Sequence, residues 1–232
     1  MGQLWDGLAD LCLGGRCVGC GHPGRPLCLD CDRRLPRHAR LRMPSPVPAG
    51  LAPAFSAAEY AGVPRSLVLA HKERGVLPLA RPLGELLAAA VRVAGPGPGP
   101  VLLVPVAGRP AAVRERGHDP MWSVAVRAAR LLPEARAARL LRCRTTSVDQ
   151  AGLGAAERAA NLAGTLWCPS AGLRRWAGLR ARVVICDDVL TTGSTAREAQ
   201  RALEAAGVRV SAIATVAATR RTRPPGRDER VR

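Results

Sequence analysis

Short, continuous apolar runs mark the expected buried strands of the chain. Residues 101–106 and 182–186 are almost wholly apolar and contain β-branched side chains, as in strands covered on both faces. After the second run, an amphipathic stretch at 194–206 predicts a helix, and a third apolar run at 208–216 predicts another strand. A strand, a helix and a strand in this order form a βαβ crossover, which implies parallel strands. The pattern therefore predicts an α/β fold, with helices flanking a parallel sheet.

Weaker periodicity places the other elements. It predicts a strand at 55–60 and helices at 63–71, 79–93, 120–132 and 153–162. Between the last two helices, the polar and non-periodic residues 142–152 predict a mobile loop. Residues 37–53 are rich in Pro and Arg and lack periodicity, which favours a linker. We therefore expect a zinc module at 1–45, a linker at 46–54, the α/β domain at 55–219 and a disordered basic tail at 220–232.

Composition narrows the class of protein. With 47% apolar but only 3% aromatic residues, the core must consist of Ala, Leu and Val, which suits helices on a parallel sheet. The formal charge of +17 would attract phosphate-rich partners. Lys72 is the only lysine, however, and the arginines are spread along the chain, which favours a solvated basic surface over a nucleic-acid groove. No apolar stretch is long enough to span a bilayer, and Asp6 and Asp10 stand where a secretory signal would carry basic residues, so we expect a cytoplasmic protein.

Two Cys-x-x-Cys pairs near the N-terminus have the spacing of a zinc knuckle. Their four thiolates can complete a closed tetrahedral Zn²⁺ shell, which leaves no open position for catalysis. We therefore predict a structural zinc site, with Cys12 or His22 as alternatives for one ligand. The predicted ligands are Cys17, Cys20, Cys28 and Cys31.

The strongest chemical signal follows the apolar run at 182–186. Asp187 and Asp188 would stand at the carboxyl edge of the sheet, where open α/β folds bind ligands. The next residues, 191–195, combine Gly193 for a tight turn with four hydroxyl side chains, and they open a helix whose free N–H groups favour an anion. The loop has no lysine, so it is not a Walker A site. Carboxylates can accept hydrogen bonds from sugar hydroxyls while the turn holds a phosphate. As an alternative for two of these residues, Thr195 and Glu198 would form a capping box.

Together, these residues resemble the phosphoribosyl pyrophosphate signature of type I phosphoribosyltransferases. Other segments are similar to the ComF family of competence-associated, phosphoribosyltransferase-like proteins, in the same order after the cysteine pairs. They are residues 70–75, 104–106 and 114–117, then Gln150, Arg158 and Asn161. The family implies a type I phosphoribosyltransferase-like parallel sheet flanked by helices, with a small zinc-ribbon-like module at the N-terminus.

The resemblance also implies roles for single residues. The acidic pair would hold the ribose hydroxyls, the backbone amides of the 191–195 loop would hold the 5-phosphate, and Mg²⁺ would bridge the diphosphate. The residues predicted to bind phosphoribosyl pyrophosphate are Val106, Arg109, Asp187, Asp188, Val189, Leu190, Thr191, Thr192, Gly193, Ser194 and Thr195. One departure is His118-Asp119-Pro120, where the family shows an aromatic residue followed by Asn-Gln.

A transferase would also need cations and carboxylates at the reacting carbon. We predict Asp187, Asp188, Lys72 and Arg158 as catalytic residues, with Lys72 near the diphosphate and Arg74 or Arg109 as alternatives. The first hypothesis is transfer of phosphoribose to an acceptor. The second is a non-catalytic component of DNA uptake that contacts single-stranded DNA or a competence helicase, although few aromatic residues are present for base stacking. A third is a sensor that binds the nucleotide without reacting.

Overall fold

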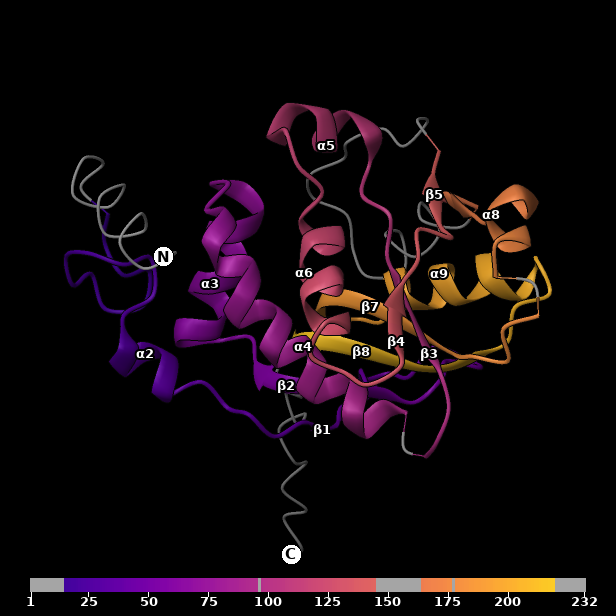
Figure 1. Ribbon diagram of the computed structural model, residues 1–232, viewed down its shortest axis with the longest axis horizontal. Coiled ribbons are helices and arrows are strands. Elements are labelled where there is room, and N and C mark those ends of the chain that lie inside the picture. Colours follow the sequence, from indigo (N-terminus) through magenta and orange to yellow (C-terminus); the bar gives the residue numbers. More distant parts are fainter. Residues whose placement is uncertain (1–14, 96, 145–163, 177, 220–232) are drawn as a thin grey trace, which may run out of the picture.

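A computed structural model describes residues 15–95, 97–144, 164–176 and 178–219 (Figure 1). Its centre is a sheet of six strands in which all neighbouring strands run parallel except the first two in the spatial order. The order across the sheet is β1 (Arg40–Leu41), β2 (Ala54–Glu59), β8 (Val210–Ala218), β7 (Arg182–Leu190), β3 (Val101–Pro105) and β4 (Ala135–Ala137). The predicted α/β class with a mostly parallel sheet is confirmed.

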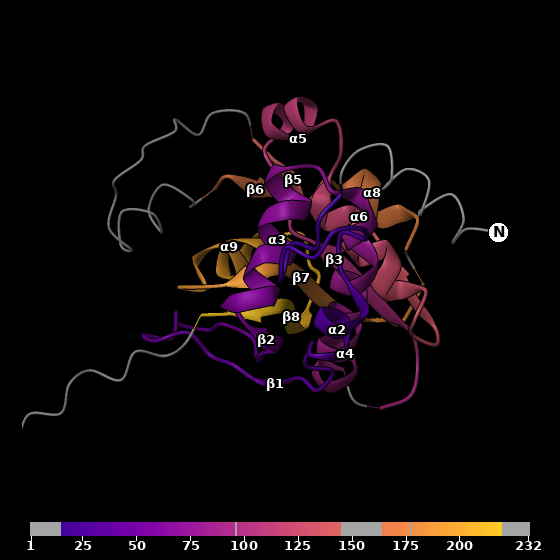
Figure 2. The same ribbon diagram turned by 90° about the vertical axis from the view of Figure 1, so that its left-hand side faces the viewer.

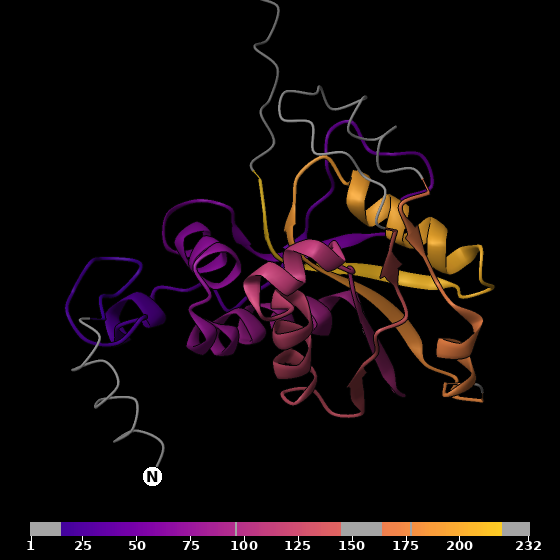
Figure 3. The ribbon, with the colours of Figure 1, turned by 90° about the horizontal axis from the view of Figure 1, so that it is seen from above.

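Helices cover both faces of this sheet. One face carries α3 (Gly62–Glu73), the short helix η1 (Leu77–Leu79), α4 (Ala80–Ala94) and α6 (Pro120–Ala129), and the other carries α9 (Ser194–Glu204) (Figure 3). Side chains alternate between the two cores along β7, because successive residues of a strand point to opposite faces. Val184 and Cys186 belong to the α4 side, whereas Val183 and Ile185 belong to the α9 side.

Smaller elements complete the described chain. The N-terminal module contains α2 (Leu29–Arg33) and packs beside the start of α3, where Val18 and Val63 join the same apolar cluster (Figure 2). A second, two-stranded sheet pairs β5 (Arg142–Cys143) with β6 (Leu166–Trp167), and α5 (Pro110–Arg116) and α8 (Ser170–Arg174) are short helices. Among the described residues, none of the helices combines the length and the hydropathy that crossing a bilayer requires.

Most predicted elements are confirmed, with two informative differences. β7 continues to Leu190, four residues beyond the predicted strand, because it keeps its parallel pairing with β8 as far as Ala218. The proline-rich residues 37–53, predicted as a linker, contain β1 and pack against α9. The buried amide of Gln200 accepts from the backbone N–H of Ala52 and donates to the carbonyl of Gly50, both at 2.9 Å. The predicted helix at 153–162 lies outside the described residues, and the domain boundaries stay predictions.

Candidate functional site

The acidic pair stands on the last part of β7, where strand alternation separates the two carboxylates. Asp188 continues the row of Val184 and Cys186, on the face covered by α3 and α4, and Asp187 continues the row on the α9 face. Each carboxylate accepts a hydrogen bond from the backbone N–H of the next residue, at 2.9 Å for Asp187 and 2.8 Å for Asp188. Two identical side chains therefore have different surroundings.

Lys72 is the ionic partner of Asp188. It lies in the last turn of α3, and its Nζ is 2.7 Å from Asp188 Oδ2. Burial acts to lower the pKa of Lys72, but the charge and hydrogen bond of Asp188, together with the charges of Asp187 and Glu73, outweigh it, so the pKa is raised and the ammonium stays charged. Burial, and then the charge of Asp188, raise the pKa of Asp187, with Lys72 acting in the opposite direction. Burial and the adjacent negative charge therefore favour the protonated form of Asp187.

The turn after β7 leads directly into α9. Gly193 is the N-cap of this helix and has a φ of 78°, a left-handed conformation that glycine adopts without strain. Thr192 Oγ1 and Ser194 Oγ are 2.9 Å apart on the outside of the turn. The capping box considered for Thr195 is wrong, because Glu198 instead accepts from the backbone N–H of Leu166 at 3.0 Å and pairs with Arg201.

A cavity of about 600 Å³ opens beside the acidic pair. Its lining includes Asp187 and Asp188, and Thr191 and Thr195 bring the start of α9 to the same space. Other predicted residues that line it are Lys72, Val106, Arg109 and Val189. Five of the predicted residues that the structure describes do not line the cavity. Leu190 is buried in the core on the α9 side, and Arg74 lies outside the wall. The other three form the turn itself: Thr192, Gly193 and Ser194. Arg158, Gln150 and Asn161 lie outside the described residues.

Several lining residues were not predicted as site residues. Glu73 and Arg116 form an ion pair at 2.8 Å that joins α3 to α5 on the cavity wall. Both fall within the segments 70–75 and 114–117 that carry the family resemblance, so the motifs contained a signal for them. Nothing in the sequence pattern pointed to the others, which are Tyr60, Val68, Leu69, Ala107, Gly108, Ala112, Val113, Met121, Cys143, Thr165 and Leu166.

The departure at His118-Asp119-Pro120 has a structural account. The His118 ring lies within hydrogen-bonding distance of the His71 carbonyl, at 3.2 Å from Nε2. Asp119 is the N-cap of α6 and accepts from the backbone N–H of Trp122 at 3.1 Å, and Pro120 occupies the first turn, where its missing N–H costs nothing. These three residues therefore connect the end of α3 to the start of α6, and both Asp119 and Pro120 also line the cavity.

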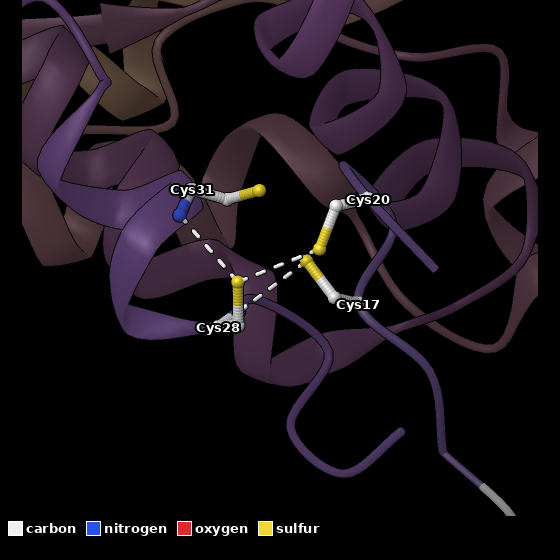
Figure 4. A group of neighbouring side chains, drawn as sticks. All are labelled: Cys17, Cys20, Cys28 and Cys31. Carbon is white, nitrogen blue, oxygen red and sulfur yellow. Dashed lines mark hydrogen bonds between the residues drawn. The ribbon is translucent and has the colours of Figure 1, made fainter. Parts of the chain in front are cut away.

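The four predicted zinc ligands gather in the N-terminal module (Figure 4). Their sulfur atoms all lie within 4.8 Å of one another, and those of Cys20 and Cys28 are 3.6 Å apart. A tetrahedral Zn²⁺ with bonds of about 2.3 Å requires sulfur separations of about 3.8 Å, so the cluster needs little rearrangement. Backbone N–H groups stabilise a thiolate here, because they outweigh burial and lower the pKa of Cys17 to about 6. Burial and the neighbouring thiols raise the pKa of Cys31 to about 12.

Comparison with known proteins finds a protein family whose sequence model matches the part of the chain that contains the acidic pair. Residues 179–231 match a family model described as the phosphoribosyl transferase domain. The matched stretch contains β7, the Gly193 turn, α9 and β8. No curated protein matches the chain. The fold, the four-cysteine cluster and this match support a phosphoribosyltransferase-like protein with a candidate metal centre.

Proposed function

We propose that the cavity beside the acidic pair binds phosphoribosyl pyrophosphate, and that the protein transfers its phosphoribose to an acceptor. One observation carries the proposal: Asp187, Asp188 and the start of α9 face the same cavity at the carboxyl edge of a parallel sheet. That edge is where ligands bind in open α/β folds.

The two ends of the ligand would use different parts of the site. The N-terminus of α9 suits the 5-phosphate, because its backbone N–H groups and helix dipole favour an anion. The carboxyl groups of Asp187 and Asp188 suit the ribose hydroxyls, which can both donate and accept hydrogen bonds. A cavity of about 600 Å³ is within the range of small-ligand sites, and Lys72 and Arg109 add positive charge to its wall for the diphosphate.

In the proposed transfer, the bond between the anomeric carbon and the pyrophosphate oxygen breaks, its electron pair leaves with pyrophosphate, and an acceptor lone pair forms the new bond. Positive charge develops on the sugar, and the carboxylate of Asp188 would stabilise it. The four cysteines are the only described group of three or more His, Cys, Asp or Glu side chains close enough to hold a metal by themselves. The family resemblance implies that Mg²⁺ would enter with the diphosphate, whose oxygens are the hard ligands it prefers, and would supply charge neutralisation there.

The test is calorimetric titration with phosphoribosyl pyrophosphate and Mg²⁺, followed by an assay for pyrophosphate release with nucleobases and amines as acceptors. The wild type should bind, and Asp188→Asn should lose binding by about 10-fold or more, as expected for a hydrogen bond to a charged group. Asp30→Asn is the control, because Asp30 is exposed on α2, away from the cavity. Absence of binding to the wild type, or equal binding by Asp188→Asn, would contradict the proposal.

Two accompanying expectations concern the rest of the chain. We propose that Zn²⁺ occupies the four-cysteine cluster as a structural ion, because four thiolates leave it no open coordination position. The described cysteines are free thiols, which is typical of a reducing compartment, so we keep the cytoplasm as the expected location.

A second candidate function rests on a different groove. A space of about 680 Å³ lies between α6, β4 and α8, and its walls carry two tryptophans and four exposed arginines. The guanidinium of Arg139 stacks over the Trp122 ring at 4.3 Å. Aromatic faces and arginines together are how proteins hold single-stranded nucleic acid. The residues are Trp122 and Trp176 with Arg130, Arg136, Arg139 and Arg175.

Fluorescence anisotropy with a labelled single strand, measured over a range of salt concentrations, tests this second candidate. Binding should weaken steeply with salt, because it releases counterions from the phosphates. Arg136→Glu should weaken binding and flatten the salt dependence, whereas Arg81→Glu, an exposed position on α4 outside the groove, should change it less. Binding that is absent, or equally affected by both substitutions, would remove this function.

A further inference from the structure

The single lysine of the chain, Lys72, competes with the ribose hydroxyls of the proposed ligand for the carboxylate of Asp188. Lys72 Nζ donates a hydrogen bond to Asp188 Oδ2 at 2.7 Å. The other oxygen of this carboxylate accepts a hydrogen bond from the backbone N–H of Val189 at 2.8 Å. A ribose hydroxyl that approaches Asp188 must therefore share or replace an existing charged contact. A neutral hydroxyl is a weaker partner for a carboxylate than an ammonium group, so this exchange is unfavourable by itself.

The surroundings strengthen the ion pair. Lys72 and Asp188 also line a small adjoining space whose other walls are mainly apolar, with Val68, Leu83 and Val124 among them. Charges attract each other more strongly beside such a wall than in water. Glu73, the nearest other carboxylate on α3, is already paired with Arg116 at 2.8 Å. The ammonium of Lys72 therefore stays paired with Asp188 unless a ligand brings a more strongly charged anion, such as a diphosphate, into the cavity.

We propose that the Lys72–Asp188 ion pair makes the site selective for ligands that carry an anionic diphosphate beside the ribose hydroxyls. Such a ligand accepts the ammonium of Lys72 and so frees Asp188 for a hydroxyl. A ribose 5-phosphate or a nucleoside monophosphate brings its phosphate only to the α9 turn, leaves Lys72 in place and binds weakly. Lys72 is then a specificity-determining residue, and this inference rests on the proposed function.

Substitution tests the selectivity. Lys72→Met should weaken the binding of phosphoribosyl pyrophosphate about 10- to 100-fold, the worth of a charged hydrogen bond. The same substitution should leave the binding of ribose 5-phosphate unchanged or make it tighter, because Asp188 becomes free. Arg81→Met, which removes an exposed charge on α4 outside the cavity, should leave the ratio of the two affinities unchanged. An equal loss for both ligands, or no loss for either, would overturn the proposal.

A second measurement needs no substitution of Lys72. Because the chain has one lysine, wild-type protein labelled with ¹³C-lysine gives a single lysine Cε signal. Phosphoribosyl pyrophosphate with Mg²⁺ should shift this signal, and ribose 5-phosphate at saturation should leave it near its free position. Equal shifts with both ligands, or no shift with either, would show that Lys72 does not change partner.

The outcomes also separate this inference from the proposed function. If the wild type binds neither ligand, the proposed function fails. If the wild type binds both ligands, but Lys72→Met leaves the ratio of affinities as it was, the proposed function stands and the selectivity of Lys72 is refuted.

Discussion

The turn at Gly193 allows a quantitative test, because two features of the structure constrain it. The residue has a φ of 78°, and a Cβ added there would lie 2.9 Å from Pro44 Cγ and 3.2 Å from Leu51 Cδ2. Gly193→Ala therefore combines backbone strain with a collision against the proline-rich segment. The left-handed conformation costs about 1–2 kcal/mol for alanine, and overpacking costs about 1–3 kcal/mol. The free energy of unfolding should fall by about 2–5 kcal/mol.

Gly207→Ala is a matched control. Gly207 has the same φ of 78°, but a Cβ there would meet nothing within 4 Å. It should therefore show the strain alone, and the difference between the two variants should equal the cost of the collision, about 1–3 kcal/mol. Urea unfolding measures both values, and titration with phosphoribosyl pyrophosphate should detect weaker binding only for Gly193→Ala. Equal destabilisation by the two substitutions would refute the packing of residues 44–51 against the turn.

Three further predictions concern single side chains. The raised pKa of Asp187 means that the folded state keeps a proton that the unfolded chain releases, so stability falls as the pH rises from the ordinary carboxyl range to the raised value. In urea unfolding, the free energy of unfolding of Asp187→Asn minus that of the wild type should therefore be more favourable to the variant at pH 9 than at pH 5. The same difference at both pH values would contradict this prediction. Cys31→Ser should lower the zinc content measured by mass spectrometry, whereas Cys168→Ser, outside the cluster, should retain it. Glu198→Gln should cost about 1–2 kcal/mol of thermal stability, because it weakens the bond to Arg201; an unchanged melting temperature would contradict that contact.

Local pattern was sufficient to predict much of this fold. Continuous apolar runs located β3 and β7, since strands covered on both faces need no polar alternation. The amphipathic spacing after Gly193 located α9, and cysteine spacing located the metal cluster. Each of these signals comes from residues close together in the sequence. The contacts of the proline-rich residues 37–53 were not predictable for the same reason, because they are made with Gln200 and Gly193, about 150 positions away.

The cavity was only half predictable for a related reason. The matched stretch at 179–231 supplies the acidic pair and the turn, and Lys72 was predicted as a site residue, but Glu73 and Arg116 also reach the cavity from α3 and α5. Which of the two carboxylates the single lysine meets depends on how α3 packs on the sheet. Single-sequence periodicity does not contain that information.

The acidic pair itself shows why motif and mechanism differ. In the sequence, Asp187 and Asp188 are two adjacent copies of one residue, and they suggest one shared role. On a strand, adjacent residues face opposite sides of the sheet, so only Asp188 meets the lysine on α3. The negative charge of Asp188 favours the proton on Asp187, in addition to the effect of burial. A hydroxyl pair on a sugar would therefore meet one acceptor and one group able to donate, which is a more selective arrangement than two equal carboxylates.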